Sequence, residues 1–160
     1  MAKFKNKYLI SFFIVIFSGR WLFSSISTTS MYDNLFESKD YVILFKMSVN
    51  YSKYREEIAS VIESKKYNKI KIKDIKNINN MISDTISKLD SIENNVKNTD
   101  IRSQIYQTRI ELENTKKLVN NTIKSVNNKD KFKSNLIELE SSLFRIEVYL
   151  KGLSQKISVL

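Results

Sequence analysis

The residues best equipped for chemistry in this sequence are five lysines within the segment KKYNKIKIK. They are Lys65, Lys66, Lys69, Lys71 and Lys73. Tyr67 lies among them, and no acid follows before Asp74. Clustered ammonium groups beside an aromatic ring can attract a sulfated glycan or another polyanion through ion contacts that weaken as the salt concentration rises. A Lys-rich linker that keeps a corner between two helices soluble has the same composition, so both interpretations stay open.

Residues suited to catalysis are scarce. The chain has no His and no Cys, which removes the commonest general base, the thiolate nucleophile and the usual zinc ligands. Glu111 and Glu113 are two positions apart and would fall on different faces of a helix. With only two Gly in the chain, neither a phosphate-binding loop nor a nucleophile elbow can be recognised. We therefore expect a protein that is not an enzyme and has no catalytic residue, metal site or cofactor.

The charge balance is basic over most of the chain. Lys and Arg number 27 against 17 Asp and Glu, a net charge of +10. Residues 1–27 hold four of the cations and no acid, so the remainder keeps a net charge of +6. A positive balance favours anionic partners, such as sulfated glycans, acidic protein surfaces, phospholipid headgroups or nucleic acid. An AT-rich genome, which enriches Lys, Asn and Ile, is an alternative origin of the same composition.

The first 27 residues have the form of an export signal. Lys3, Lys5 and Lys7 precede the uncharged run YLISFFIVIF over residues 8–17. This is a basic region followed by an apolar region too short to span a bilayer comfortably. We expect residues 1–27 to be a signal peptide or an uncleaved anchor that associates with a membrane. Export to the cell envelope or outer surface would separate the chain from intracellular nucleic acid, which is therefore not an expected partner.

The end of the apolar run is similar to a bacterial lipobox. Residues 17–19, FSG, stand where an apolar residue and two small residues precede the lipidated Cys, but Arg20 occupies the Cys position. A guanidinium cannot form the thioether that holds the lipid, so anchoring by that route is excluded. Cleavage after Ser27 would release a mature chain, whereas the apolar residues 21–23 would extend the run into an uncleaved anchor.

Apolar residues spaced three and four positions apart dominate the rest of the chain. The most regular seam lies in residues 132–157. Its members are Phe132, Leu136, Leu139, Leu143, Ile146, Leu150, Leu153 and Ile157. Such a stripe occupies one face of a helix and must be buried against other helices. Similar stripes predict further helices over residues 41–64, from near Asp74 to Asn98, and from Asp100 to about Val126.

These patterns predict an all-α fold. The Asn-Gly and Asp-Gly pairs typical of β-hairpins do not occur. Short polar connections between helices of about 25 residues indicate antiparallel neighbours. We therefore expect an antiparallel helical bundle of about four helices over residues 41–157, after a polar tether over residues 28–40. One extended coiled coil is the alternative.

Two details of the helices can also be predicted. Asp40 and Asp100 stand where a carboxylate could cap the first-turn amides of the first and third helices. Alternate seam positions of the third helix are Thr, including Thr108, Thr115 and Thr122. Because Thr covers less apolar area than Leu and can bond to the carbonyl four residues earlier, we expect the third helix to be packed most thinly.

The organisation of the chain carries a resemblance to a known family. A Lys-containing N-terminus, the lipobox-like FSG, a polar tether and a helical part rich in Lys, Asn, Ile and Ser together resemble the plasmid-encoded surface lipoproteins of Borrelia spirochaetes. The resemblance covers the whole chain in composition and organisation. It implies a helical surface antigen of the kind that binds complement regulators, complement proteases or extracellular-matrix components. Arg20 departs from the lipidated Cys of this family, and no motif carries over a binding residue.

The leading hypothesis is an exported, non-enzymatic antigen or adhesin-like protein that binds a host macromolecule, either a complement or matrix protein or a sulfated glycan. One alternative is a structural coiled-coil protein of the envelope that self-associates through the Thr-rich face of the third helix. Another alternative is a decaying lipoprotein paralogue in which Arg20 has replaced the anchor Cys. Sedimentation separates a compact monomer from an assembly, and labelling with palmitate tests for a lipid anchor.

Overall fold

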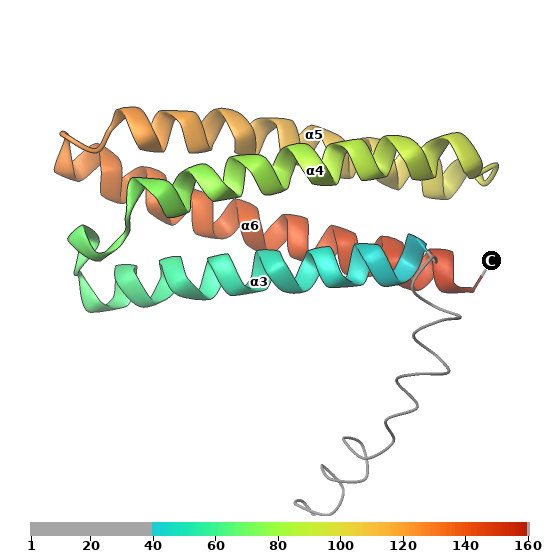
Figure 1. The fold of residues 1–160 in the computed structure, drawn as a ribbon, viewed down its shortest axis with the longest axis horizontal. Coiled ribbons are helices and arrows are strands. Elements are labelled where there is room, and N and C mark those ends of the chain that lie inside the picture. The colour runs from blue at the N-terminus through green and yellow to red at the C-terminus, as the bar shows by residue number, and fades with distance from the viewer. Residues whose placement is uncertain (1–39, 160) are drawn as a thin grey trace, which may run out of the picture. The chain divides into compact units, whose positions relative to one another are not determined.

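The computed structural model describes residues 40–159, and within them four long α-helices form an antiparallel bundle (Figure 1). The helices are α3 (Asp40–Ser64), α4 (Ile72–Asn95), α5 (Thr99–Lys124) and α6 (Lys129–Ser158). A short 3-10 helix, η1 (Tyr67–Lys69), lies between α3 and α4, and the described part of the chain contains no strand. The predicted all-α bundle is confirmed. The predicted signal or anchor over residues 1–27 and the tether up to residue 39 lie outside the described residues.

Helix α6 is the central element, because it packs against both α3 and α5, while α4 packs mainly on α5. The seam predicted for α6 lies in the core. Six of its side chains are fully buried: Leu136, Leu139, Leu143, Ile146, Leu150 and Leu153. Burying one Leu or Ile side chain contributes roughly 1.5–3 kcal/mol, so this seam is a major source of stability. In contrast, α3 and α4 contact each other at few places.

The Thr-rich face of α5 points into the bundle. Thr108, Thr115 and Thr122 are at most 1% exposed. Their Oγ1 atoms donate hydrogen bonds of 2.7, 2.8 and 2.8 Å to the carbonyl oxygens four residues earlier. The buried hydroxyls are thereby satisfied without a partner from another helix. Because the chain's own core covers this face, self-association would need a different surface.

Helix α5 is capped by Asn98, whose Oδ1 accepts hydrogen bonds from the backbone N–H groups of Asp100 at 2.9 Å and Ile101 at 3.2 Å. The prediction that Asp100 is the cap was wrong, because the helix already begins at Thr99 and the residue before it takes the capping position. The Asp100 carboxylate instead accepts a hydrogen bond of 2.6 Å from Lys156 Nζ on α6.

Two contacts join α3 to α4 over the first half of α3. Asp40 is the first residue of α3, and its Oδ1 lies 2.8 Å from Lys88 Nζ on α4. Tyr51 is fully buried, and its hydroxyl forms a hydrogen bond of 3.0 Å with Thr85 Oγ1. Burial raises the pKa of the Tyr51 hydroxyl, although the hydrogen bond with Thr85 opposes the rise. The phenol therefore stays protonated, and Tyr51 is a packing residue of the core.

An ion-pair cluster holds α3 to α6. Arg55 Nε lies 3.2 Å from Glu147 Oε2, and Arg55 Nη1 lies 3.6 Å from Glu140 Oε1. Lys151 Nζ donates to the other Glu147 oxygen at 2.6 Å. The Arg55 guanidinium also lies 5.4 Å from the centroid of the Phe144 ring, within the range of a cation–π interaction. One partly buried arginine thus contacts two carboxylates and a ring on α6.

Candidate functional site

The predicted lysine segment lies at the end of the bundle where α3 ends and α4 begins. Lys65 follows α3 directly and has a φ of 54°, the left-handed conformation that commonly terminates a helix. The chain then passes through η1 and the extended residue Lys71 into α4. Because the helices are antiparallel, the end of α5 and the start of α6 lie at this same end of the bundle (Figure 1).

We call this region the lysine end, and define it as residues 63–76 of the α3–α4 connection together with residues 124–133 of the α5–α6 connection. It contains ten lysines, and all of them are exposed. They are Lys65, Lys66, Lys69, Lys71, Lys73, Lys76, Lys124, Lys129, Lys131 and Lys133. Three acids accompany them, Glu63, Asp74 and Asp130, so the lysine end carries a charge of +7.

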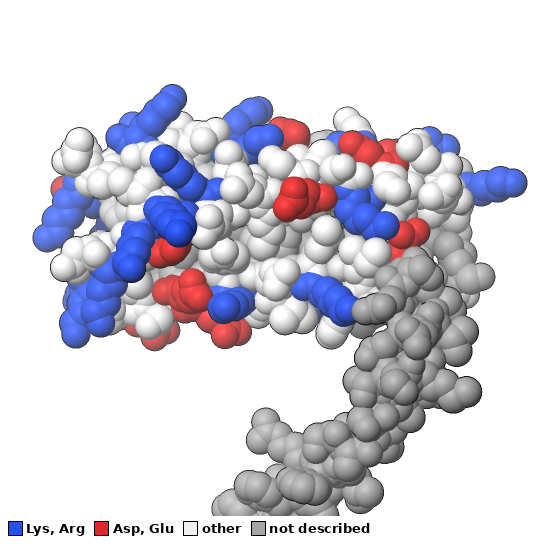
Figure 2. All heavy atoms as spheres, in the orientation of Figure 1, with Lys and Arg blue, Asp and Glu red and all other residues white. Residues whose placement is uncertain are grey.

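The lysine end holds all of the net charge of the described bundle. Residues 40–159 contain 22 Lys and Arg against 15 Asp and Glu, which is also a balance of +7. The rest of the bundle is therefore neutral. In Figure 2 the Lys and Arg side chains gather at the end of the bundle where η1 lies in Figure 1. Like charges concentrated in one region produce a stronger local potential than the same charges spread over the surface.

Within the described residues, the cations of the lysine end form no ion pair. Every ion pair among residues 40–159 uses a cation from the neutral part of the bundle. These cations are Arg55, Lys88, Arg102, Arg109, Arg145, Lys151 and Lys156. An exposed ammonium group with no internal partner can bind an external anion without first breaking an ion pair.

The structure brings together all five of the lysines singled out in the sequence, and it adds five more. The predicted ones are Lys65, Lys66, Lys69, Lys71 and Lys73. The ones that sequence analysis missed are Lys76, Lys124, Lys129, Lys131 and Lys133. Most of the missed lysines are far away in sequence, and antiparallel packing of α6 on α3 places them at the same end. An up-down bundle puts its first and third connections together, so the polar break at residues 127–130 was the available signal.

The start of the helix that follows the lysine segment differs slightly from the prediction. Helix α4 begins at Ile72 rather than near Asp74. Lys73 therefore lies in the first turn of α4, and Lys69 is the last residue of η1. The segment predicted to be either a loop or a lead-in to the helix is both, because a 3-10 turn and the two extended residues Ile70 and Lys71 precede the first turn of α4.

The side-chain types define the chemistry of the lysine end. It contains no Arg, whose planar fork would indicate bidentate binding of a single carboxylate or phosphate. Lysine ammonium groups on flexible stems act as separate point charges. Ten of them match a ligand with many spaced negative groups. Among residues 40–159, no cluster of three or more acidic side chains could hold a metal ion.

The helices of residues 40–159 lack the combination of length and apolar character that a membrane crossing requires. No protein-family model matches the chain, and no curated protein or solved structure matches it. The fold and the charge distribution define the class of protein: it is a four-helix bundle with a polycationic end.

Proposed function

We propose that the protein is a non-enzymatic binding protein that captures a sulfated polyanion through its lysine end. The observation that carries the proposal is that the lysine end, with ten exposed lysines that form no ion pair within residues 40–159, holds the whole net charge of the described bundle. Sulfate groups repeat along a glycan chain, so one ligand can contact several ammonium groups at once. Each exposed contact is worth only about 0.2–1 kcal/mol, and affinity arises from their number.

The N-terminal sequence supports a site of action outside the cytoplasm. A basic region and an apolar run over residues 8–17 precede the bundle, an arrangement typical of export. The composition and organisation of the chain also resemble those of Borrelia surface lipoproteins. The proposed protein is therefore an exported, adhesin-like component of a spirochaete envelope, and its proposed ligand is a sulfated glycan of the host matrix.

Binding of the full-length chain to immobilised heparin tests the ligand class. The test variant replaces three lysines of the lysine end by Gln: Lys66, Lys69 and Lys71. The matched control replaces three exposed lysines of the neutral part: Lys46, Lys97 and Lys117. Loss of three contacts of about 0.5 kcal/mol each is expected to raise the Kd about tenfold, whereas the control should change it less than about threefold. Equal loss from both variants would contradict a localised site.

Salt and alternative ligands sharpen this test. The Kd for heparin should rise steeply between low and physiological salt, because added ions screen exposed charges. Desulfated heparin should bind more weakly than heparin. If the chain bound vesicles containing phosphatidylserine, or an acidic complement protein, more tightly than heparin, that lipid or protein would be the ligand class in place of a glycan. Complete protection of the protein from protease added to intact cells would contradict a surface location.

A further inference from the structure

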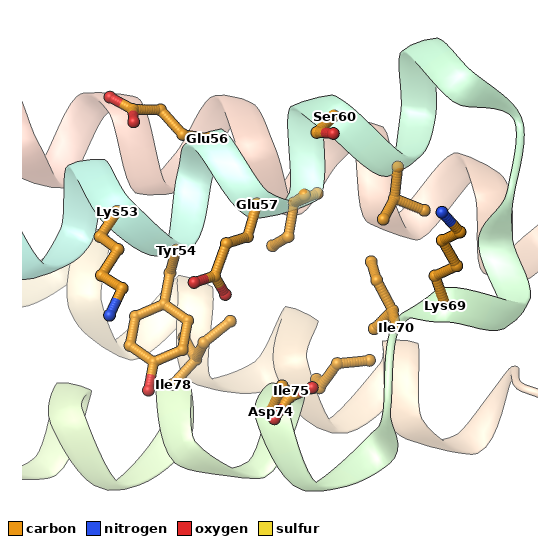
Figure 3. Close-up of a pocket in the computed structure, with 12 residues that line it drawn as sticks. Lys53, Tyr54, Glu56, Glu57, Ser60, Lys69, Ile70, Asp74, Ile75 and Ile78 are labelled. Atoms are coloured by element: carbon orange, nitrogen blue, oxygen red, sulfur yellow. The ribbon is translucent and has the colours of Figure 1, made fainter.

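A cleft separates the second half of α3 from the start of α4, beside the lysine end (Figure 3). The ion pair and the buried hydrogen bond between α3 and α4 lie before Tyr54, and no described side chain beyond Tyr54 forms either kind of link between these two helices. A cavity of about 500 Å³ opens there. A second hollow of about 540 Å³ shares four lining residues with it. These are Lys53, Tyr54, Glu57 and Asp74, so the two hollows adjoin each other, and we name them together the cleft.

The floor of the cleft is apolar. Ile58, Ile75 and Ile78 line it and are 4%, 1% and 2% exposed. Val61 and Ile70 continue the floor into the lysine end and are partly buried. In Figure 3 the side chains of Ile70, Ile75 and Ile78 point into the space between the two helices. An apolar floor of this kind gains free energy when an apolar group of a ligand covers it.

The rim of the cleft is acidic, in contrast to the neighbouring lysine end. Four carboxylates line it: Glu56, Glu57, Asp74 and Asp84. Against them stand Lys53 and Lys69, which leaves a local charge of −2. None of the four carboxylates belongs to an ion pair within residues 40–159. Glu57 reaches from α3 into the cleft toward α4 (Figure 3).

We propose that this cleft binds a basic segment of a protein partner. An apolar side chain of that segment covers the isoleucine floor, and a Lys or Arg side chain enters between Glu57 and Asp74. The aliphatic stem of Lys or Arg can lie along Ile70 or Ile78 while its charged head reaches the carboxylates. The cleft adjoins the lysine end and shares Lys69, Ile70, Asp74 and Ile75 with it, but its ligand contacts the carboxylates and carries the opposite charge.

Charge complementarity favours a basic segment in the cleft over a polyanion or a wholly apolar segment. Within the cleft, the unpaired carboxylates of the rim repel a polyanion, which contacts the lysines outside the cleft instead. A wholly apolar segment would remove water from Glu57 and Asp74 without supplying a counter-charge, which costs free energy. A basic segment supplies that charge, and the open carboxylates accept hydrogen bonds from it.

The probe for this site is a fluorescein-labelled amphipathic peptide with Leu on one helical face and Lys along both flanks. A matched peptide carries Glu in place of Lys. Fluorescence anisotropy with the full-length chain measures both Kd values. The variant E56Q/E57Q removes two cleft carboxylates that lie outside the lysine end; it should raise the Kd of the Lys peptide about tenfold and leave heparin binding intact. The control E113Q/E138Q neutralises two exposed, unpaired carboxylates outside the cleft and should change the Kd less than about twofold.

A second variant tests the floor. Ile70→Ser removes a partly exposed apolar side chain from the connection before α4 and should also weaken the Lys peptide. Circular dichroism of each variant checks that the bundle is folded. The proposal is overturned if the Lys peptide does not bind the wild-type chain, if both carboxylate pairs have equal effects, or if folded Ile70→Ser binds normally. If the wild-type chain binds the Lys peptide but does not bind heparin, the cleft proposal stands and the lysine end is not a glycan site.

Discussion

Lys65 has a backbone conformation that suits glycine better than lysine. Its φ of 54° costs an L-residue about 1–2 kcal/mol, and a residue directly after a helix in this conformation is usually Gly. Lys65→Gly should therefore increase the free energy of unfolding by about 0.5–1 kcal/mol, because the relieved strain exceeds the extra entropy of Gly in the unfolded chain. Unfolding in urea, followed by circular dichroism, measures the change.

The neighbouring residue provides the control for this prediction. Lys66 has a φ of −98°, so Lys66→Gly removes the same charge without relieving strain and should lower the free energy of unfolding. If both variants were stabilised equally, the cause would be reduced repulsion among the lysines and not backbone strain at Lys65.

The capping residue of α5 was not predicted correctly from the sequence. Asn98, Thr99 and Asp100 follow one another, and each has a side chain that can cap a helix. The choice between them depends on where the buried face begins, and Ile101 is 2% exposed within the first turn of α5. In the structure Asn98 precedes the helix, and the residue types alone do not distinguish it from the two that follow.

Gly152 lies in the last third of α6, and an added Cβ there would have no atom within 4 Å. Gly152→Ala should therefore increase the free energy of unfolding by about 1 kcal/mol, the difference in helix propensity between the two residues. A rise in the urea midpoint with an unchanged slope would agree with this expectation. A lower midpoint would mean that Gly152 serves close packing after all.

The helices themselves could be predicted because each carries an apolar stripe of helical period. The stripe of α6 gave the core residues directly, since Leu139, Leu143 and Leu150 are fully buried. A stripe identifies the face that is covered, but it does not say how closely two neighbouring helices approach. The cleft between α3 and α4 therefore could not be predicted, although Glu56 and Glu57 in α3 were a hint that its second half is less completely covered.

The distribution of charge is a property of the whole molecule. Residues 63–76 and 124–133 are each basic, and neither alone accounts for the net charge of the bundle. The antiparallel topology brings the two connections to one end, so the potential there is set by the fold and by the composition together. The remaining cations and acids are balanced and supply the ion pairs between the helices.

Two of these paired carboxylates make the whole bundle sensitive to acid. The hydrogen bond from Arg109, aided by its charge, lowers the pKa of Glu93 at the α4–α5 contact. Burial raises the pKa of Glu147, but the hydrogen bonds and charges of Lys151 and Arg55 outweigh burial, so the net shift is downward. A carboxyl whose pKa is lower in the folded than in the unfolded state stabilises the fold above its unfolded pKa. That contribution is lost as the pH falls through the folded pKa.

The free energy of unfolding should therefore vary little from pH 7 to about 5 and fall once the pH drops below the unfolded value near 4.5. Protonation of the acids also leaves the 22 Lys and Arg of residues 40–159 without compensation, which adds repulsion across the bundle. Urea unfolding at several pH values measures this curve. The variant E93Q/E147Q should be less stable at pH 7 and should lose less stability on acidification. If its curve ran parallel to that of the wild type, the acid sensitivity would come from general repulsion and not from these two ion pairs.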